Sequence, residues 1–168
     1  MSRCSLLGLV SLAVAVLSAS ANAQYAAIEN LAGPRVGFTL LSGGITSKLK
    51  SEAQIDVGPV ITQFGWQVEK RFLSTPDGFT GVTEFVGLVG GMDQGQVLPS
   101  ATWLVGFRTP TGLEFAVGPN VTPISASIAY AGGVTLRYGS LNVPVNLAVV
   151  PSREGVRMSI LSGFNLRR

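Results

Sequence analysis

The feature that most constrains this fold is a clear alternation of apolar with small or polar residues over positions 127–168. Three consecutive segments show it, and they contain Val134, Val145 and Ile160 on their apolar faces. A period of two residues is typical of β-strands whose two faces meet different environments. The short connections between them, Gly139-Ser140 and residues 151–155, fit antiparallel hairpins. This part of the chain therefore predicts three antiparallel strands.

The same pattern recurs towards the N-terminus and predicts about five more strands. We expect them over residues 35–41, 60–73, 80–91, 97–109 and 113–117, with Gly118-Pro119-Asn120 ending the last. Residues 45–53 break the alternation and fit either a short amphipathic helix, capped by Thr46 or Ser47, or a polar loop. About eight antiparallel strands without a long helix predict an all-β, up-and-down β-barrel over residues 35–168.

Residues 1–23 have the features of a secretory signal peptide. Arg3 provides a positive charge, residues 6–17 form an apolar run, and Ala21-Asn22-Ala23 fits a cleavage site. A membrane anchor is the alternative, but the run is shorter than the ~20 residues that a spanning helix needs. We therefore expect an exported protein in which residues 24–34 lead into the barrel. The only cysteine, Cys4, lies in the signal peptide, so the mature chain has no disulfide.

Charged residues are too few to cover the surface of a soluble β-protein. They make up 12% of the chain, about half of the roughly 25% that is usual in soluble domains. The basic residues are scattered along the strands, so no patch for nucleic acid is predicted. Two arrangements of an eight-stranded barrel remain: a soluble barrel with its apolar face inward, or a membrane barrel with that face towards lipid.

The polar faces of the strands favour the membrane barrel. They carry mostly Gly, Ala, Ser, Thr and Asn with one or two charges per strand, which suits a narrow interior where charges can pair. The polar side chains expected to form a network in this interior are Gln67, Glu69, Arg71, Arg108, Glu114, Arg137, Asn146, Arg157 and Asn165.

The aromatic residues of the apolar faces are expected to contact lipid or to form girdles at the membrane interfaces. They are Phe64, Trp66, Trp103, Tyr130, Tyr138 and Phe164. Ordinary core aromatics are the alternative interpretation.

The predicted strand over residues 80–91 does not divide cleanly into two faces. Val82, Val86 and Leu88 form its apolar face, and Glu84 falls on that same face. A β-bulge near Glu84, which would shift the register, is one explanation.

The chain has no histidine, which excludes several kinds of catalytic site. A Ser-His-Asp or Cys-His arrangement cannot be built, and zinc sites draw on His and Cys. We therefore predict no metal, no cofactor and no enzymatic activity. A carboxylate-dependent hydrolase using Glu69, Glu84 or Glu114 is a weaker alternative, because a single Glu per strand more often pairs with a cation inside a barrel.

The chain resembles the small eight-stranded outer-membrane β-barrel proteins of bacteria in its signal peptide, alternating strands, tight turns and cysteine-free mature part. The segments 63–67 (QFGWQ) and 161–165 (LSGFN) are similar to those of uncharacterised exported bacterial proteins. The resemblance implies an outer-membrane location and no particular activity. Two features depart from the pattern: such barrels commonly end in an aromatic residue, whereas this chain ends in Leu166-Arg167-Arg168, and Pro144 interrupts a strand.

The leading hypothesis is a non-enzymatic outer-membrane barrel with a structural or surface-interaction role and the lipid bilayer as its partner. Side chains would fill its interior, since eight strands leave little room for a pore. The alternative is a soluble periplasmic or secreted barrel that binds a small apolar ligand. The sequence identifies neither a ligand nor an oligomeric state.

Overall fold

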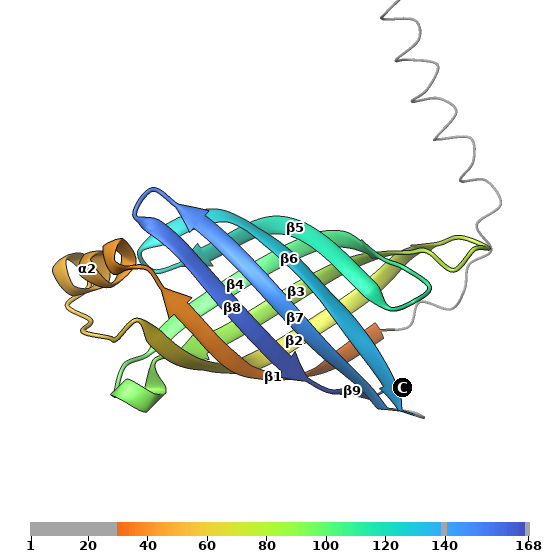
Figure 1. Cartoon of the computed structure of the whole chain (residues 1–168), viewed down its shortest axis with the longest axis horizontal. Helices are drawn as coiled ribbons and strands as arrows, with labels where there is room; N and C mark the ends of the chain where they lie inside the picture. Colours follow the sequence, from red (N-terminus) through yellow and green to blue (C-terminus); the bar gives the residue numbers. More distant parts are fainter. Residues whose placement is uncertain (1–29, 139–140, 167–168) are drawn as a thin grey trace, which may run out of the picture.

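The computed structural model describes residues 30–138 and 141–166 and shows a closed antiparallel β-barrel (Figure 1). The strands are β1 (Asn30–Leu41), β2 (Val60–Ser74), β3 (Thr80–Gly90), β4 (Leu98–Arg108), β5 (Leu113–Thr122), β6 (Ser125–Tyr138), β7 (Leu141–Ser152), β8 (Gly155–Gly163) and β9 (Asn165–Leu166). From β1 to β8 each strand pairs with the next, and β1 closes the barrel by pairing with both β2 and β8. The predicted up-and-down barrel is confirmed. The predicted signal peptide and the Gly139-Ser140 turn lie outside the described residues.

The short strand β9 is the continuation of β8, so the barrel has eight strands in effect. Arg35 pairs with Gly163 of β8 and Ala32 pairs with Leu166 of β9, which is one unbroken register. The β1–β8 register brings Phe164, at the break, opposite Pro34. The β7–β8 register brings Gly163 opposite Pro144. Proline has no N–H to donate to a ladder. The two prolines therefore explain why strand pairing is interrupted here.

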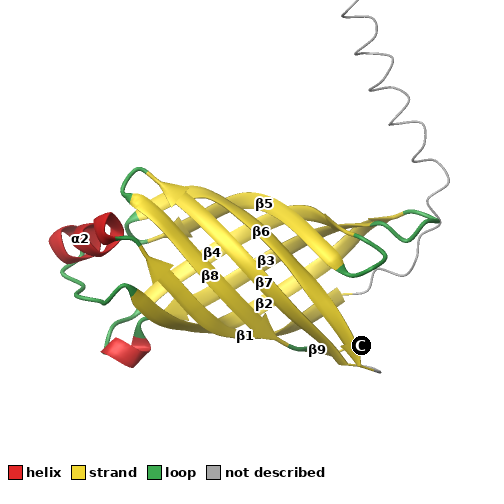
Figure 2. Ribbon diagram, viewed as in Figure 1, coloured by secondary structure: helices red, strands yellow, loops and turns green. Residues whose placement is uncertain are grey.

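The barrel has two different ends (Figure 2). At one, here called the helix end, lie the helix α2 (Gly43–Glu52), the 3-10 helix η2 (Met92–Gln94) and the β5–β6 and β7–β8 turns. At the other, here called the terminus end, lie the start of β1, the end of β9 and the β2–β3 and β4–β5 turns. In the described part of the chain, no helix has the length and apolar character needed to cross a membrane.

The predicted helix near residues 45–53 is confirmed, but its start differs from the prediction. It begins at Gly43 after the N-cap residue Ser42, and not after Thr46 or Ser47. The hydroxyl of Ser42 accepts a hydrogen bond from the N–H of Val156 instead of capping its own helix. Gly155 allows this contact, because a Cβ there would lie 1.9 Å from the Ser42 Oγ. The helix is thus attached to the β7–β8 turn.

Two strands extend beyond the predicted bounds. β1 begins at Asn30 and not at Arg35, since Leu31 is buried and pairs with Glu69 despite the Gly33-Pro34 sequence. β5 does not end at residues 118–120 but continues to Thr122.

The wall of the barrel has an apolar outer face and a polar or small inner face, as predicted for most strands. Phe64, Trp66, Val145 and Ile160 are 48%, 54%, 38% and 58% exposed on the outside. Among the described residues, more large hydrophobic side chains are exposed than buried. This is the inverse of a soluble globular domain.

The strand β3 lies where it was predicted, but the orientation of its faces and the suggested bulge at Glu84 were wrong. Val82, Val86 and Leu88 point inward and are buried together with Glu84, whereas Phe85 of the alternate face is 54% exposed. No bulge lies at Glu84, which pairs regularly with Glu69. The bulge lies in β2 between Arg71 and Leu73, where Phe72 is the extra residue. The inner face is therefore continuous around the barrel, and it carries a carboxylate on β3.

Candidate functional site

A compact group of charged side chains fills the interior near the terminus end. The guanidinium of Arg108 donates two hydrogen bonds to Glu69, at 2.8 and 2.5 Å, and one to Glu114, at 2.6 Å. Thr135 donates to the same Glu114 oxygen. Glu69 is 1% exposed and Arg108 4%. We call Glu69, Arg108, Glu114 and Thr135 the Arg108 cluster.

A second chain of hydrogen bonds runs beside this cluster. Arg35, which is 2% exposed, donates to the side-chain oxygens of Gln67 and Asn165, both at 2.9 Å. It also donates to the carbonyl of Pro34. Gln67 in turn donates to Glu84 at 2.9 Å. Side chains from the first and last strands are thus joined inside the barrel, which ties the closure of the barrel to this polar interior.

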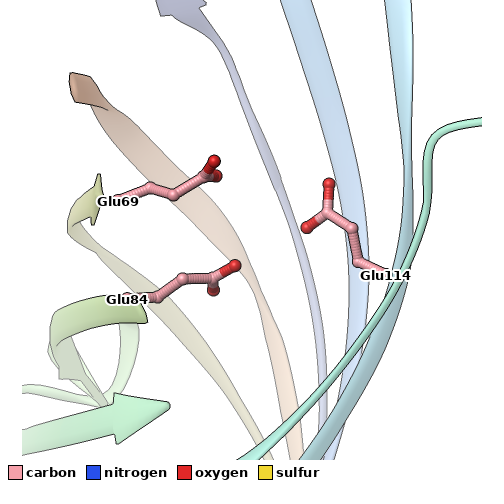
Figure 3. Close-up of side chains that lie close together, drawn as sticks. All are labelled: Glu69, Glu84 and Glu114. Atoms are coloured by element: carbon pink, nitrogen blue, oxygen red, sulfur yellow. The ribbon is translucent and has the colours of Figure 1, made fainter. Parts of the chain in front are cut away.

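Glu69, Glu84 and Glu114 bring three carboxylates close together (Figure 3). One oxygen of each lies within 4.8 Å of those of the other two. Such spacing could suit a hard cation, but the Arg108 guanidinium already bridges Glu69 and Glu114. The arrangement is a paired ionic network in which both oxygens of Glu69 and one oxygen of Glu114 accept hydrogen bonds from Arg108. That no metal binds here stays a prediction.

The middle of the barrel encloses a cavity of about 70 Å³. Its walls are mostly small or apolar, with Val86, Leu88, Leu104, Ala129 and Leu161 among them. At one end it reaches Glu84 and Glu114, and at the other it reaches a second polar layer towards the helix end. A cavity of this size can hold several waters, but it is not a continuous wide channel.

The second polar layer is built around Arg157 of β8. Its guanidinium donates to the Asn120 oxygen at 2.7 Å. The Asn120 amide nitrogen donates to the hydroxyls of Ser100 and Thr102, at 2.9 and 2.7 Å. These side chains all line the central cavity. We call Arg157, Asn120, Ser100 and Thr102 the Arg157 layer.

Apolar side chains close the helix end. Ile45 and Leu49 of α2 pack with residues of the barrel mouth and the adjoining loop, which are Leu41, Val57, Ile61 and Leu98. A smaller cavity of about 40 Å³ separates this apolar cap from Arg157. Helix α2 therefore covers the interior at this end.

The loops of the helix end are held by exposed polar contacts. Lys48 of α2 lies 2.7 Å from Glu154 in the β7–β8 turn. This hydrogen bond raises the pKa of Lys48 and lowers the pKa of Glu154 relative to their ordinary values. Asp93 of η2 accepts hydrogen bonds from the hydroxyl and N–H of Thr62, and the hydroxyl bond lowers the pKa of Asp93.

Most of the expected interior residues point into the barrel, but they belong to separate groups and not to a single network. Gln67, Glu69, Arg108, Glu114 and Asn165 are buried and belong to the hydrogen-bonded groups near the terminus end. Arg71 lies beside them, with its Nε 3.8 Å from Glu69. Asn146 lines the central cavity, and Arg157 forms the separate layer. The Arg137 side chain lies outside the described part of the structure.

The expected outer aromatics lie on the outer surface wherever their side chains are described. Besides Phe64 and Trp66, Trp103 is 58% exposed, Tyr130 56% and Phe164 46%. The indole N–H of Trp103 donates to Thr83 at 2.8 Å, along the outer face. The Tyr138 side chain lies outside the described residues. Assignment of these aromatics to lipid contact or to girdles stays a prediction.

Sequence reasoning missed several interior residues. Arg35, Thr39 and Asn120 are buried, and so are Gln63 and Asn142, which the alternation placed on polar faces but which were not among the candidate interior residues. For Arg35 and Thr39 a signal was present, since they alternate with Val36, Phe38 and Leu40. Glu84 was named only as a possible catalytic group or as the sign of a bulge, although its position between apolar neighbours marks an inner face that is itself partly apolar.

The fold is similar to that of solved membrane barrels. No protein-family model matches the chain, and no curated protein matches it significantly. The backbone structure of the Yersinia pestis outer membrane protein Ail in a phospholipid bilayer nanodisc is 11% identical, with a TM-score of 0.50 over 83% of this chain and 100% of that chain. The chain has the fold of an eight-stranded outer-membrane barrel. At this identity the likeness concerns the fold alone, and for the fold it confirms the resemblance predicted from the sequence.

Two further solved structures are similar at lower scores. The crystal structure of Ail from Yersinia pestis in complex with the heparin analogue sucrose octasulfate is 10% identical, with a TM-score of 0.46 over 83% of this chain and 99% of that chain. A de novo designed transmembrane β-barrel is also 10% identical, with a TM-score of 0.46 over 87% of this chain and 99% of that chain.

Proposed function

We propose that this protein is a non-enzymatic barrel of the outer membrane, with a structural or surface-interaction role and with the lipid bilayer as its main partner. The observation that carries the proposal is the apolar outer face, on which Phe38, Trp66, Trp103, Phe115 and Ile160 are each at least half exposed. In water such a surface would be unfavourable by about 25 cal/mol for each Å² of apolar area. In a bilayer the same surface contacts hydrocarbon, and the closed barrel leaves no strand edge unpaired.

The interior supports a structural role better than transport. The Arg108 cluster crosses the barrel near the terminus end, and α2 with its apolar neighbours covers the helix end. Glu69 and Glu114 are both bonded to Arg108, and Glu84 accepts a hydrogen bond from Gln67, so no two of the three carboxyl groups are left free to act as the acid and base of such a hydrolase. We therefore do not propose the carboxylate-dependent hydrolase. The soluble carrier of an apolar ligand would need most of its large apolar side chains inside, and in the described part of the chain most of them are outside.

Fractionation with a heat-mobility assay tests the proposed location. We expect the protein to sediment with outer membranes, to need detergent for extraction, and to migrate differently on a gel before and after boiling. Release with the soluble periplasm, without any change in mobility on boiling, would contradict the membrane assignment and favour the soluble barrel.

A charge on the outer face provides a sharper test of lipid contact. Ile160 lies near the middle of β8 and is 58% exposed, so Ile160→Arg should cost about 2–4 kcal/mol of folding free energy in lipid vesicles. Val156 lies on the same face at the helix end of that strand, so Val156→Arg is the matched control, with an expected cost of about 0–1 kcal/mol. Urea titration of the barrels in lipid vesicles measures the folding free energy of both variants. Equal costs at the two depths would argue against a bilayer around the barrel.

The lengths of the connections support one orientation in the membrane. The two longest connections, residues 42–59 and 91–97, both lie at the helix end, and membrane barrels place longer loops outside and short turns in the periplasm. The helix end would then face the exterior. In intact cells a membrane-impermeant maleimide should label Ser47→Cys in α2 but not Thr111→Cys in the β4–β5 turn. The opposite labelling would reverse the orientation.

A further inference from the structure

We propose that the interior of the barrel binds a small monocarboxylate, with its carboxylate on the Arg157 guanidinium and its short aliphatic chain in the central cavity. This inference goes beyond the proposed function and does not depend on where the barrel resides. Three features carry it: the pairing of Arg157, the donors around it, and the shape and charge of the cavity.

Arg157 differs from Arg35 and Arg108 in what it binds. Arg108 is bonded to two carboxylates, and Arg35 donates three hydrogen bonds. Within residues 30–138 and 141–166, the one hydrogen bond of Arg157 goes to the neutral Asn120 side chain, and no carboxylate lies within ion-pair distance. A guanidinium carries five N–H donors. Arg157 therefore presents most of its donors, and an uncompensated positive charge, to the cavities.

The neighbours of Arg157 add donors rather than acceptors. Because the Asn120 amide nitrogen donates to the hydroxyl oxygens of Ser100 and Thr102, each hydroxyl keeps its own proton to donate. Both hydroxyls line the same cavity as Arg157, and the side chain of Gln63 lies there too. A charged group with hydroxyl donors beside it is the chemistry that binds a carboxylate.

The cavity selects a single charge with an apolar tail. Beyond the Arg157 layer the wall consists of Val86, Leu88, Leu104 and other aliphatic or small side chains, which favour hydrocarbon. The far end of the cavity carries Glu84 and Glu114, and among the described residues that line the cavity no cation besides Arg157 could balance a second negative group. One guanidinium balances one carboxylate. The volume of about 70 Å³, with the adjoining cavity of about 40 Å³ that Arg157 also lines, limits the acid to a short chain such as that of butyrate and excludes a long-chain fatty acid.

Titration of the wild-type protein with butyrate tests the proposal directly. The full-length protein in uncharged detergent micelles is titrated at pH 7, and the methyl resonances of Ala129, Val150 and Leu161 are followed by NMR. We expect saturable shifts of these resonances with butyrate and none with butyramide, the neutral analogue of the same shape. An absence of saturable shifts with butyrate, or equal shifts with butyramide, would overturn the proposal.

Two arginines of the same hairpin supply the matched variants. Arg157→Gln should weaken butyrate binding by about tenfold or more, since a charge-assisted hydrogen bond is lost. Arg153→Gln removes the same charge from the exposed turn and should leave the affinity within about twofold. Unchanged affinity in Arg157→Gln would exclude the guanidinium as the binding group. If Arg157→Gln fails to fold, as judged by heat mobility, the comparison of butyrate with butyramide on the wild-type protein still decides whether the cavity binds a carboxylate.

Discussion

The two ends of the barrel interior are filled in different ways. Near the terminus end, Arg108, Glu69 and Glu114 compensate one another through short hydrogen bonds, and all three are nearly inaccessible to water. At the helix end, Ile45 and Leu49 of a surface helix cover the mouth with apolar contacts. The polar side chains of the terminus end belong to the strands of the barrel wall. The apolar side chains that cover the helix end come largely from the connection between β1 and β2, which contains α2.

This difference matters for how each end responds to change. A buried charge depends on its partner, so removal of one member leaves a buried charge without compensation. An apolar cap has no such obligatory pairing, and its loss can remain local. The terminus end should therefore govern the stability of the whole barrel, and the helix end should govern access to its interior.

The largest expected effect is the loss of Arg108. Arg108→Met would remove the guanidinium that compensates the buried Glu69 and Glu114 and leave them only Arg71 and Thr135, respectively, as partners within the described part of the chain, and such a loss typically costs about 3–5 kcal/mol. Urea unfolding of the barrel in vesicles, followed by gel mobility, measures the change. Arg153→Met, in an exposed turn, is the control and should stay within about 0.5 kcal/mol.

Arg157 gives a second comparison within the interior. Because no carboxylate depends on it, Arg157→Met should cost only about 1 kcal/mol, mainly through the loss of its bond to Asn120. If Arg108→Met and Arg157→Met were equally destabilising, the distinction between a paired and an unpaired interior arginine would fail.

A smaller and more local effect is expected at the apolar cap. Leu49 is 4% exposed, so Leu49→Ala should lower the free energy of opening of residues 43–59 by about 2–3 kcal/mol. The unfolding of the whole barrel should change by less than about 1 kcal/mol, because α2 lies outside the strand ladders. Amide hydrogen exchange reports the first quantity and urea unfolding the second. Ser47→Ala, on the exposed face of the same helix, is the control.

Equal losses in local and global stability after Leu49→Ala would contradict this separation. They would mean that the cap and the barrel unfold as one cooperative unit.

The fold could be predicted from the sequence because its main signal is local. Alternation in β4, β5, β6 and β7 placed Trp103, Phe115, Tyr130 and Val145 on the outside, where they lie. The alternation does not indicate which face of a strand is inward when both faces are apolar. For this reason the predicted orientation of the faces of β3 was wrong. The bulge at Phe72 and the break at Phe164 depend on neighbouring strands, so no local pattern reveals them.

The interior could be predicted only as a set of residues and not as a set of contacts. Arg108 and Glu69 are 39 positions apart, and Arg35 and Asn165 are 130 apart. Their pairing follows from the tilt and register of the closed barrel, which no sequence spacing contains. For the same reason the separation of Arg157 from every described carboxylate could not be foreseen, although it distinguishes Arg157 from Arg108.

The smallest expected effect concerns the link between α2 and the β7–β8 turn, and it depends on pH. Glu154 has a lowered pKa in the folded protein, so its pair with Lys48 contributes above the ordinary glutamate value of about 4.3 and is lost as the pH falls through the lowered value. Lys48 has a raised pKa, so its contribution is present below about 10.4 and is lost as the pH rises through the raised value. A spin label on Ser47→Cys should therefore be least mobile between these limits and become more mobile in acid. Glu154→Gln should show the mobile spectrum at neutral pH as well. A label whose mobility rises in acid to the same extent in both proteins would mean that another group holds the helix end, and that Lys48 and Glu154 only lie near each other.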